Sequence, residues 1–385
     1  MDGLRQQYKQ IQSFGLSSNP LKGDFANRNA YPNYSKVGPF NNLAGFGINT
    51  CNVNTFSVSE FGSFGTAGTK YTFAVEVPNG YIYMGGPGAN LLKLSISDES
   101  SSVTAISTAL NIGVVWKNFI VCQSSTAPNT SLRYVDWTNG DKIDIVPFGE
   151  ATPTGLMIIN GLMYSLVGNG TNAKICIWDI DSRSMVDKIF IPNSGVTASR
   201  WLGFANDGRY IYYAPFNENY YLKFDTITYQ FENLTTGLAT GGSLFQGLVY
   251  HPVTKLLYSI PSSHTNPQAV DFQNKVVRNL GSSLGAGVIK YTYCTISITG
   301  EIIASGRNST TVLKISPYSE SVIAFGSLTG DNTILAGRHH GIIQCSNGNL
   351  YCTPYQSQYI CKISPAGRVN ADPNWAMNTS NNRTQ

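Results

Sequence analysis

Four histidines are the side chains of this chain best suited to acid–base catalysis or metal binding: His251, His264, His339 and His340. Imidazole ligates metals and exchanges a proton near neutral pH. His339 and His340 are adjacent, and in the β-strand expected there they point to opposite faces, so the pair does not easily share one metal. His264 stands in the polar loop 262–266, where we expect it to be exposed to solvent. The histidines therefore predict no metal site.

The carboxylates show no spacing typical of a catalytic or calcium site. Three pairs of neighbouring acids lack the calcium-loop pattern: Asp98 and Glu99, Asp141 and Asp144, and Asp179 and Asp181. Glycosidases need two carboxylates that flank one glycosidic bond, and nothing in the spacing demonstrates such a pair. Phosphate-binding loops, zinc-protease motifs and nucleophile elbows are missing from the sequence. We therefore predict that the protein is not an enzyme, with no catalytic residue, no cofactor and no intrinsic metal.

The cysteines also favour a structural role. Their number, seven, is odd, and in a chain of 385 residues this does not indicate a disulfide framework. Four of them lie in expected strands, which indicates buried free thiols: Cys122, Cys176, Cys352 and Cys361. Cys352 and Cys361 lie on adjacent strands of one expected hairpin, so we predict that they are cross-strand neighbours.

The sequence contains a repeat of about 45 residues, and this repeat predicts the secondary structure that would position any functional site. Seven copies begin at turns, each followed by a β-rich run: Gly80, Lys117-Asn118, Gly161, Gly208, Thr254-Lys255, Gly300 and Gly348. Asn-Gly and Asp-Gly turns between alternating apolar residues indicate β-hairpins. Seven all-strand repeats of this length predict an all-β, seven-bladed propeller. A sandwich of quasi-regular hairpins is the alternative.

A second motif marks the end of the last strand in several repeats. Its copies are Phe61-Gly62, Phe148-Gly149, Leu280-Gly281 and Phe325-Gly326. The first copy has no repeat in front of it, and the last repeat, about residues 341–365, has three expected strands instead of four. We therefore predict that residues 54–64 form the outer strand of the seventh blade. Such a mixed blade closes the ring and leaves no blade open at the chain ends.

Composition narrows the class of protein. Charged residues make up 12% of the chain, about half of the usual share, so Asn, Ser, Thr, Gly and Gln must cover much of the surface. Such surfaces are typical of virion and extracellular proteins, and we expect a virion location with an extracellular one as the alternative. The net charge of +4, carried by scattered Lys and Arg, predicts no nucleic-acid binding. The apolar runs are strand-length, which predicts no membrane span, and the N-terminal residues lack the apolar region of a secretory signal.

We expect three parts in the chain: an extended N-terminal arm (1–50), the propeller (51–367) and a polar C-terminal tail (368–385). The arm and the tail match no repeat. Their aromatic side chains need a surface to lie on: Tyr31, Tyr34, Phe40, Phe46 and Trp375. Because ordering an extended arm costs about 1–2 kcal/mol per residue in backbone entropy, a few contacts would not hold it. We therefore predict that these aromatics contact another subunit of an assembly.

The propeller itself offers a binding surface. Loops between the second and third strand of each blade should emerge on one face, together with the connections between blades. Candidate contact residues on this face are Phe216, Tyr220, His264, Arg307 and Tyr355. We expect a neutral rim, rich in Asn, Ser and Tyr, that suits contact with protein or carbohydrate. The alternative is a rim that is merely soluble.

The repeat reads Asn-Gly-x-Leu/Ile-Tyr-x-x-Pro-Tyr/Phe, followed by Ile/Leu-x-Lys-Ile/Phe-Ser/Asp. It resembles propeller repeats of the kelch, WD and NHL type without matching any one of them, since Trp178-Asp179 is a lone WD pair. Over about residues 54–367 it is most similar to propeller repeats of tailed-phage and other virion proteins. This resemblance implies a structural or adhesion role, other virion subunits as partners, and a host-surface glycan or protein as a further one. It implies no catalytic residues. A propeller enzyme or lectin that acts on a glycan is the runner-up, and an intracellular scaffold is a third alternative.

Overall fold

The computed structural model describes residues 55–64, 70–106, 109–124, 131–150, 153–168, 172–192, 199–235, 237–238, 242–285, 287, 289–328 and 337–365. All of them belong to one compact unit, Asn54–Gln385. The expected arm, with Tyr31, Tyr34, Phe40 and Phe46, and the expected tail, with Trp375, lie outside the described residues and stay predictions. No helix in the described part is long and apolar enough to cross a membrane.

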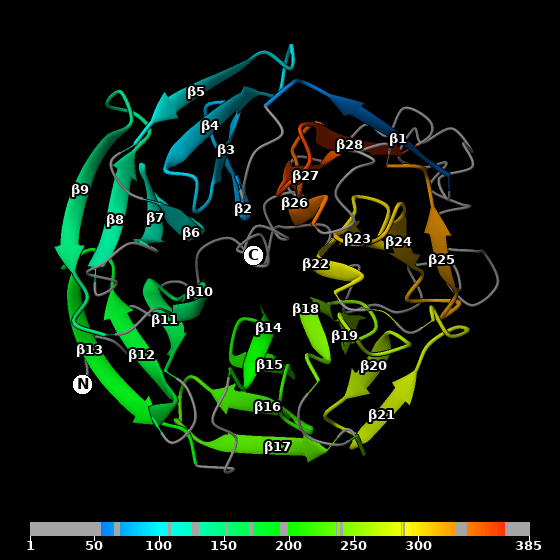
Figure 1. The fold of residues 1–385 in the computed structure, drawn as a ribbon. Coiled ribbons are helices and arrows are strands. Elements are labelled where there is room, and N and C mark those ends of the chain that lie inside the picture. The colour runs from blue at the N-terminus through cyan, green and yellow to red at the C-terminus, as the bar shows by residue number, and fades with distance from the viewer. Residues whose placement is uncertain are drawn as a thin grey trace, which may run out of the picture. The chain divides into compact units, whose positions relative to one another are not determined.

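The described residues form seven four-stranded antiparallel sheets, the blades of a propeller (Figure 1). Blade 1 contains β2 (Phe73–Val77), β3 (Tyr81–Gly85), β4 (Asn90–Ser95) and β5 (Ser101–Ala105). Blade 2 contains β6 (Leu110–Trp116), β7 (Phe119–Ser124), β8 (Ser131–Asp136) and β9 (Lys142–Pro147). Blade 3 contains β10 (Pro153–Ile159), β11 (Leu162–Val167), β12 (Lys174–Asp179) and β13 (Ser184–Phe190). Blade 4 contains β14 (Trp201–Asn206), β15 (Tyr210–Pro215), β16 (Tyr220–Asp225) and β17 (Phe231–Thr235).

Blade 5 contains β18 (Phe245–His251), β19 (Leu256–Pro261), β20 (Gln268–Asp271) and β21 (Val276–Asn279). Blade 6 contains β22 (Tyr291–Ile296), β23 (Ile302–Gly306), β24 (Val312–Ile315) and β25 (Val322–Phe325). Blade 7 contains β26 (His339–Gln344), β27 (Leu350–Pro354), β28 (Ile360–Pro365) and, at its outer edge, β1 (Phe56–Phe61). In Figure 1 the first strand of each blade lies near the centre of the ring and the last strand lies at the rim. The predicted seven-bladed propeller is confirmed.

The predicted closure of the ring is also confirmed. β1 pairs antiparallel with β28 over six residues, from Phe56 opposite Pro365 to Phe61 opposite Ile360. Figure 1 shows the blue β1 beside the red β28, although the two strands come from opposite ends of the propeller sequence. Blade 7 is therefore built from both ends of the repeat region, which ties the first blade to the last.

The turns that define the repeat behave as predicted. Each of the seven lies between the first and second strand of its blade, and each holds a residue with positive φ: Gly80, Lys117, Gly161, Gly208, Lys255, Gly300 and Gly348. The second motif ends the outermost strand of four blades, and its glycines also have positive φ: Gly62, Gly149, Gly281 and Gly326. Glycine adopts this conformation without the penalty that a Cβ brings. Both motifs therefore mark places where the backbone must turn.

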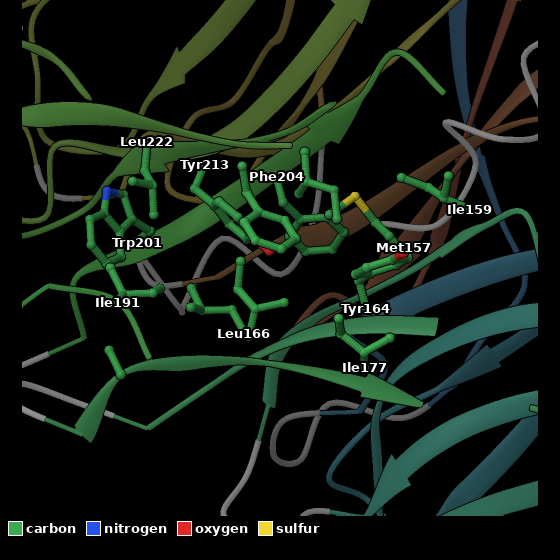
Figure 2. Close-up of a cluster of buried hydrophobic side chains, with 14 residues drawn as sticks. Met157, Ile159, Tyr164, Leu166, Ile177, Ile191, Trp201, Phe204, Tyr213 and Leu222 are labelled. Atoms are coloured by element: carbon green, nitrogen blue, oxygen red, sulfur yellow. The ribbon is translucent and has the colours of Figure 1, made fainter. Parts of the chain in front are cut away.

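The hydrophobic core is divided among the interfaces between neighbouring blades. Figure 2 shows the cluster between blades 3 and 4, where Tyr164 and Leu166 of β11 pack with Phe204 and Tyr213 of blade 4. Similar clusters join the other pairs of blades. β1 serves two of them: Phe56 and Val58 pack toward blade 6, and Phe61 packs toward blade 1. Every blade therefore needs both neighbours to bury its faces.

Around the centre, the first strands of adjacent blades approach each other very closely. In six blades the pairing of the first two strands skips one residue near the start of the first strand. Glycines lie there in blades 4, 5 and 7, and a Cβ on Gly203, Gly247 or Gly341 would stand 2.8, 2.3 or 2.8 Å from a backbone oxygen of the next blade. The oxygens belong to Gln246, Thr292 and Thr72. Only glycine permits this separation between blades.

Replacing Gly247 by alanine should therefore destabilise the propeller. The new Cβ would meet the Thr292 carbonyl at 2.3 Å, and backbone cannot move aside as a flexible side chain can. We expect a loss of about 1–3 kcal/mol in the free energy of unfolding, the usual cost of overpacking. Urea denaturation measures it. Gly287→Ala is the matched control, because its nearest atom is 3.4 Å away on the flexible Lys290 side chain. Equal stability of the two variants would contradict the close approach.

Candidate functional site

The loop face is the side of the propeller formed by the loops between second and third strands and by the connections between blades. Because strands alternate in direction within each blade, these two sets of segments emerge on the same side. All five predicted contact residues lie on it: Phe216 and Tyr220 in blade 4, His264 in blade 5, Arg307 in blade 6 and Tyr355 in blade 7. Each is half-buried. The structure brings four of them into two clusters.

The first cluster surrounds Arg200, the residue before β14. Its Nε donates to Oε1 of Glu218, and both side chains are 1% exposed. Nη2 of Arg200 donates to the hydroxyl of Tyr220 at 2.7 Å, and its guanidinium lies 4.3 Å from the ring centroid of Trp201. The Arg200 carbonyl accepts the backbone N–H of Phe216 at 2.9 Å. This buried ion pair fixes the loop that carries Phe216 and Tyr220, and its two charges neutralise each other.

The second cluster joins Arg307 and Tyr355 across blades 6 and 7. The Arg307 guanidinium lies 4.5 Å from the Tyr355 ring centroid, and Nη2 lies 3.3 Å from the Tyr355 hydroxyl. The ring of His340 stacks on Tyr355 at 5.0 Å and 23°. Its other neighbour is Tyr293, whose ring is 4.9 Å away and steeply inclined. The aromatic rings therefore hold the Arg307 guanidinium in place without a carboxylate.

His264 joins neither cluster, and the expectation that it is exposed is wrong. It is half-buried, because its ring packs against Phe245 with the centroids 5.1 Å apart. Its Nδ1 lies 2.8 Å from the Asn266 carbonyl, and its own carbonyl accepts a hydrogen bond from Nζ of Lys290. The polar sequence around it concealed this aromatic contact.

The other three histidines are packed into the fold. Burial lowers the pKa of His251 to about 4 and, with the positive charge of Arg307 adding to it, that of His340 to about 3. Burial also lowers the pKa of His339, although Glu60 lies 3.8 Å away and opposes this. Each ring has a nearby polar partner, such as the Thr72 carbonyl at 3.1 Å from Nδ1 of His340. Neutral, enclosed imidazoles are poor general acids at neutral pH.

The thiols are equally inert. The six cysteines in the described part are free and buried: Cys122, Cys176, Cys294, Cys345, Cys352 and Cys361. Cys352 and Cys361 are register partners on β27 and β28, which confirms the predicted cross-strand pair. Burial raises the pKa of Cys176 to about 12, so the reactive thiolate is scarce. Within the described residues, no three His, Cys, Asp or Glu side chains are grouped to hold a metal.

Sequence reasoning missed a set of basic residues on the loop face. In three blades a basic residue comes directly before the aromatic or histidine that opens the innermost strand: Arg200 before Trp201, Lys290 before Tyr291 and Arg338 before His339. In blade 1 Lys70 precedes Tyr71, which lies two residues before β2. This recurring pair is a signal that the sequence does contain. The predicted neutral rim therefore does not hold where blades 6, 7 and 1 meet, because the connections between blades add Lys70, Lys290 and Arg338 to Arg307 of the loop between β23 and β24. We call Lys70, Lys290, Arg307 and Arg338 the basic cluster.

Solved structures with the same architecture include two lyases and a WD40 propeller domain. Virginiamycin B lyase from Staphylococcus aureus, in a catalytically inactive histidine-to-alanine form with quinupristin, has a TM-score of 0.65 at 10% identity, covering 80% of this chain and 99% of the lyase. A streptogramin B lyase gives 0.63 at 12% identity, covering 80% and 97%. The WD40 propeller domain of Doa1 gives 0.62 at 13% identity, covering 81% and 97%. The chain matches no protein-family model and no curated protein sequence. These likenesses show a propeller fold and nothing finer.

Proposed function

We propose that this protein is a non-enzymatic binding propeller of a virion, anchored to its assembly by residues 1–50, which presents the loop face to a protein or a glycan. The observation that carries the binding role is the state of the ionisable groups on that face. Glu218 is neutralised by Arg200, His340 is stacked between aromatic rings, and Arg307 lies on Tyr355. These interactions leave the groups poorly suited to act as proton donors or nucleophiles, and they fix the loops that form the contact surface.

The rim of the propeller supports the assembly role. Outermost strands of five blades expose apolar side chains: Val103, Ile145, Val186, Phe190, Val276 and Ile323, which are 43–62% exposed. These strands also present backbone edges that a neighbouring chain can pair with. Exposed apolar groups beside an open strand edge suit contact with other subunits. The low charge content of the chain and the resemblance of its repeats to virion propellers point in the same direction.

A propeller enzyme is the second candidate, because the lyases with the same fold include a form inactivated by loss of a histidine. In this chain His340 packs beside loop-face residues, against Tyr355 and near Arg307. Turnover of quinupristin by the purified protein, removed by His340→Ala, would favour the enzyme. The packing of the ring instead supports a structural role.

Deleting residues 1–45 tests the proposed function. Particles should then lack the protein, because the arm supplies the anchor, while the purified propeller should keep its melting temperature, because β1 begins at Phe56. Mass spectrometry of particles purified from the source measures occupancy. Undiminished occupancy of the deleted protein, or absence of the full chain from the particles, would refute the virion role.

A further inference from the structure

The basic cluster unites residues that are far apart in the sequence. Backbone hydrogen bonds connect its members in order: the N–H of Arg307 donates to Lys290 O (2.9 Å), that of Arg338 to Arg307 O (2.6 Å), that of Tyr355 to Arg338 O (3.0 Å) and that of Lys70 to Tyr355 O (2.8 Å). In Figure 1 the place can be followed at the inner ends of blades 6, 7 and 1, beside β22, β26 and β2. Four residues with cationic side chains are therefore linked through their backbones on one side of the ring.

Lys290, Arg307 and Arg338 form no ion pair with a carboxylate of the described residues. Nζ of Lys290 donates to the carbonyls of His264 and Gly285 at 2.9 and 2.7 Å. Arg307 contacts the Tyr355 ring and hydroxyl. Arg200, which precedes β14 of blade 4 as Arg338 precedes β26, is instead neutralised by an ion pair with the buried Glu218. The cluster is therefore a local excess of positive charge, in a chain that pairs a comparable cation elsewhere.

Arg338 is the central member. Arg338 is only 7% exposed, and its Nε atom is buried without a hydrogen-bond partner in the described part of the chain. Beside it, Gln356 donates its N–H to the carbonyl of Gly337, and the side-chain oxygen of Gln356 is buried and lacks a donor. Burying a donor and an acceptor without hydrogen-bond partners lowers the stability of the folded protein. A ligand with an anionic oxygen and a hydroxyl group would satisfy both.

We propose that the basic cluster binds the acidic group, a carboxylate or a sulfate, of an anionic glycan. Arg307 and Arg338 donate to the oxyanion, Lys70 and Lys290 add charge around it, and a sugar hydroxyl donates to Gln356. Tyr355 and His340 are positioning residues, since they hold the Arg307 guanidinium by stacking. A sugar fits better than an acidic peptide because each acidic sugar unit carries the anion and the hydroxyl together. The inference rests on the proposed binding role of the loop face and names its ligand class.

Calorimetry with the full chain tests this. The probes are heparin fragments, which carry sulfate, polysialic acid, which carries carboxylate, neutral dextran and poly-glutamate. One of the two acidic glycans should bind at low salt and weaken as salt screens the cluster. Arg307→Gln, at a half-buried position, should weaken that binding about tenfold or more, the usual value of a hydrogen bond between charged groups. Arg209→Gln is the control, because Arg209 lies in a turn on the opposite side and pairs with Asp225.

Three outcomes would overturn the inference. They are no binding of either acidic glycan, binding of poly-glutamate alone, and equal weakening by Arg307→Gln and Arg209→Gln. Because the Arg338 side chain is buried, the melting temperature of Arg338→Gln must match that of the parent before its binding counts. Binding of dextran that is lost in Tyr220→Ala but kept in Arg307→Gln would overturn the acidic ligand while leaving the proposed binding face intact.

Discussion

Removing residues 1–65 should abolish cooperative unfolding of the propeller, while removing residues 1–45 should not. The longer deletion takes away β1, which pairs with β28 over six residues and packs Phe56 and Val58 toward blade 6 and Phe61 toward blade 1. Losing these partly buried side chains costs on the order of 5 kcal/mol. A typical domain is stable by only about 5–15 kcal/mol. The open ring would also expose the edge of β28, a site for aggregation.

Urea denaturation followed by circular dichroism measures this difference. The parent and the 1–45 deletion should share a midpoint and a slope, and the 1–65 deletion should show a shallower, earlier transition. A synthetic peptide that spans residues 54–65 should restore part of the lost stability, because it can pair with β28 in trans. A 1–65 deletion with the parent's midpoint would show that the mixed blade does not close the ring.

The fold could be predicted because its signals are local. A turn that needs positive φ selects glycine or asparagine within two or three residues, so the copies at Gly161, Gly208, Gly300 and Gly348 are visible in the chain. The mixed blade followed from counting, since an orphan end motif at Phe61-Gly62 and a three-strand last repeat complete each other. Periodicity alone thus gave the number of blades and the way the ring closes.

The contacts of the site could not be predicted, because they form between blades. Gly247 looks like any strand glycine until the Thr292 carbonyl of the next blade is in place 2.3 Å from its missing Cβ. Likewise, Arg307 and Arg338 become neighbours only when blades 6 and 7 are docked. The positions of Lys290 and Arg338 were readable in principle, since each directly precedes the residue that opens an innermost strand. These cations lie in the connections between blades, which vary in length, and there the sequence repeat is least regular.

Lowering the pH from 7.5 to 5.0 should destabilise the protein through its buried histidines. The pKa of a histidine is about 6.5 in the unfolded chain. In the folded protein burial lowers it to about 4 for His251 and about 3 for His340, and lowers it for His339 as well. Below pH 6.5 the unfolded state therefore binds more protons, so the free energy of unfolding falls as the pH falls toward 4. At pH 5.0 each histidine accounts for a loss of about 2 kcal/mol.

Two carboxyl groups, those of Glu301 and Asp225, also affect how the free energy of unfolding depends on pH. Burial raises the pKa of Glu301, so its contribution to stability grows on acidification and offsets part of the loss. The hydrogen bond from Arg209 helps to lower the pKa of Asp225 to about 2, so that carboxylate acts below pH 4 and outside the window. Urea midpoints at pH 7.5, 6.0 and 5.0 measure the effect, and His251→Gln should reduce the slope by about one histidine's share. Equal stability from pH 7.5 to 5.0 would mean that these rings take up protons in the folded protein, and the enclosed packing of His340 against Tyr355 would then be wrong.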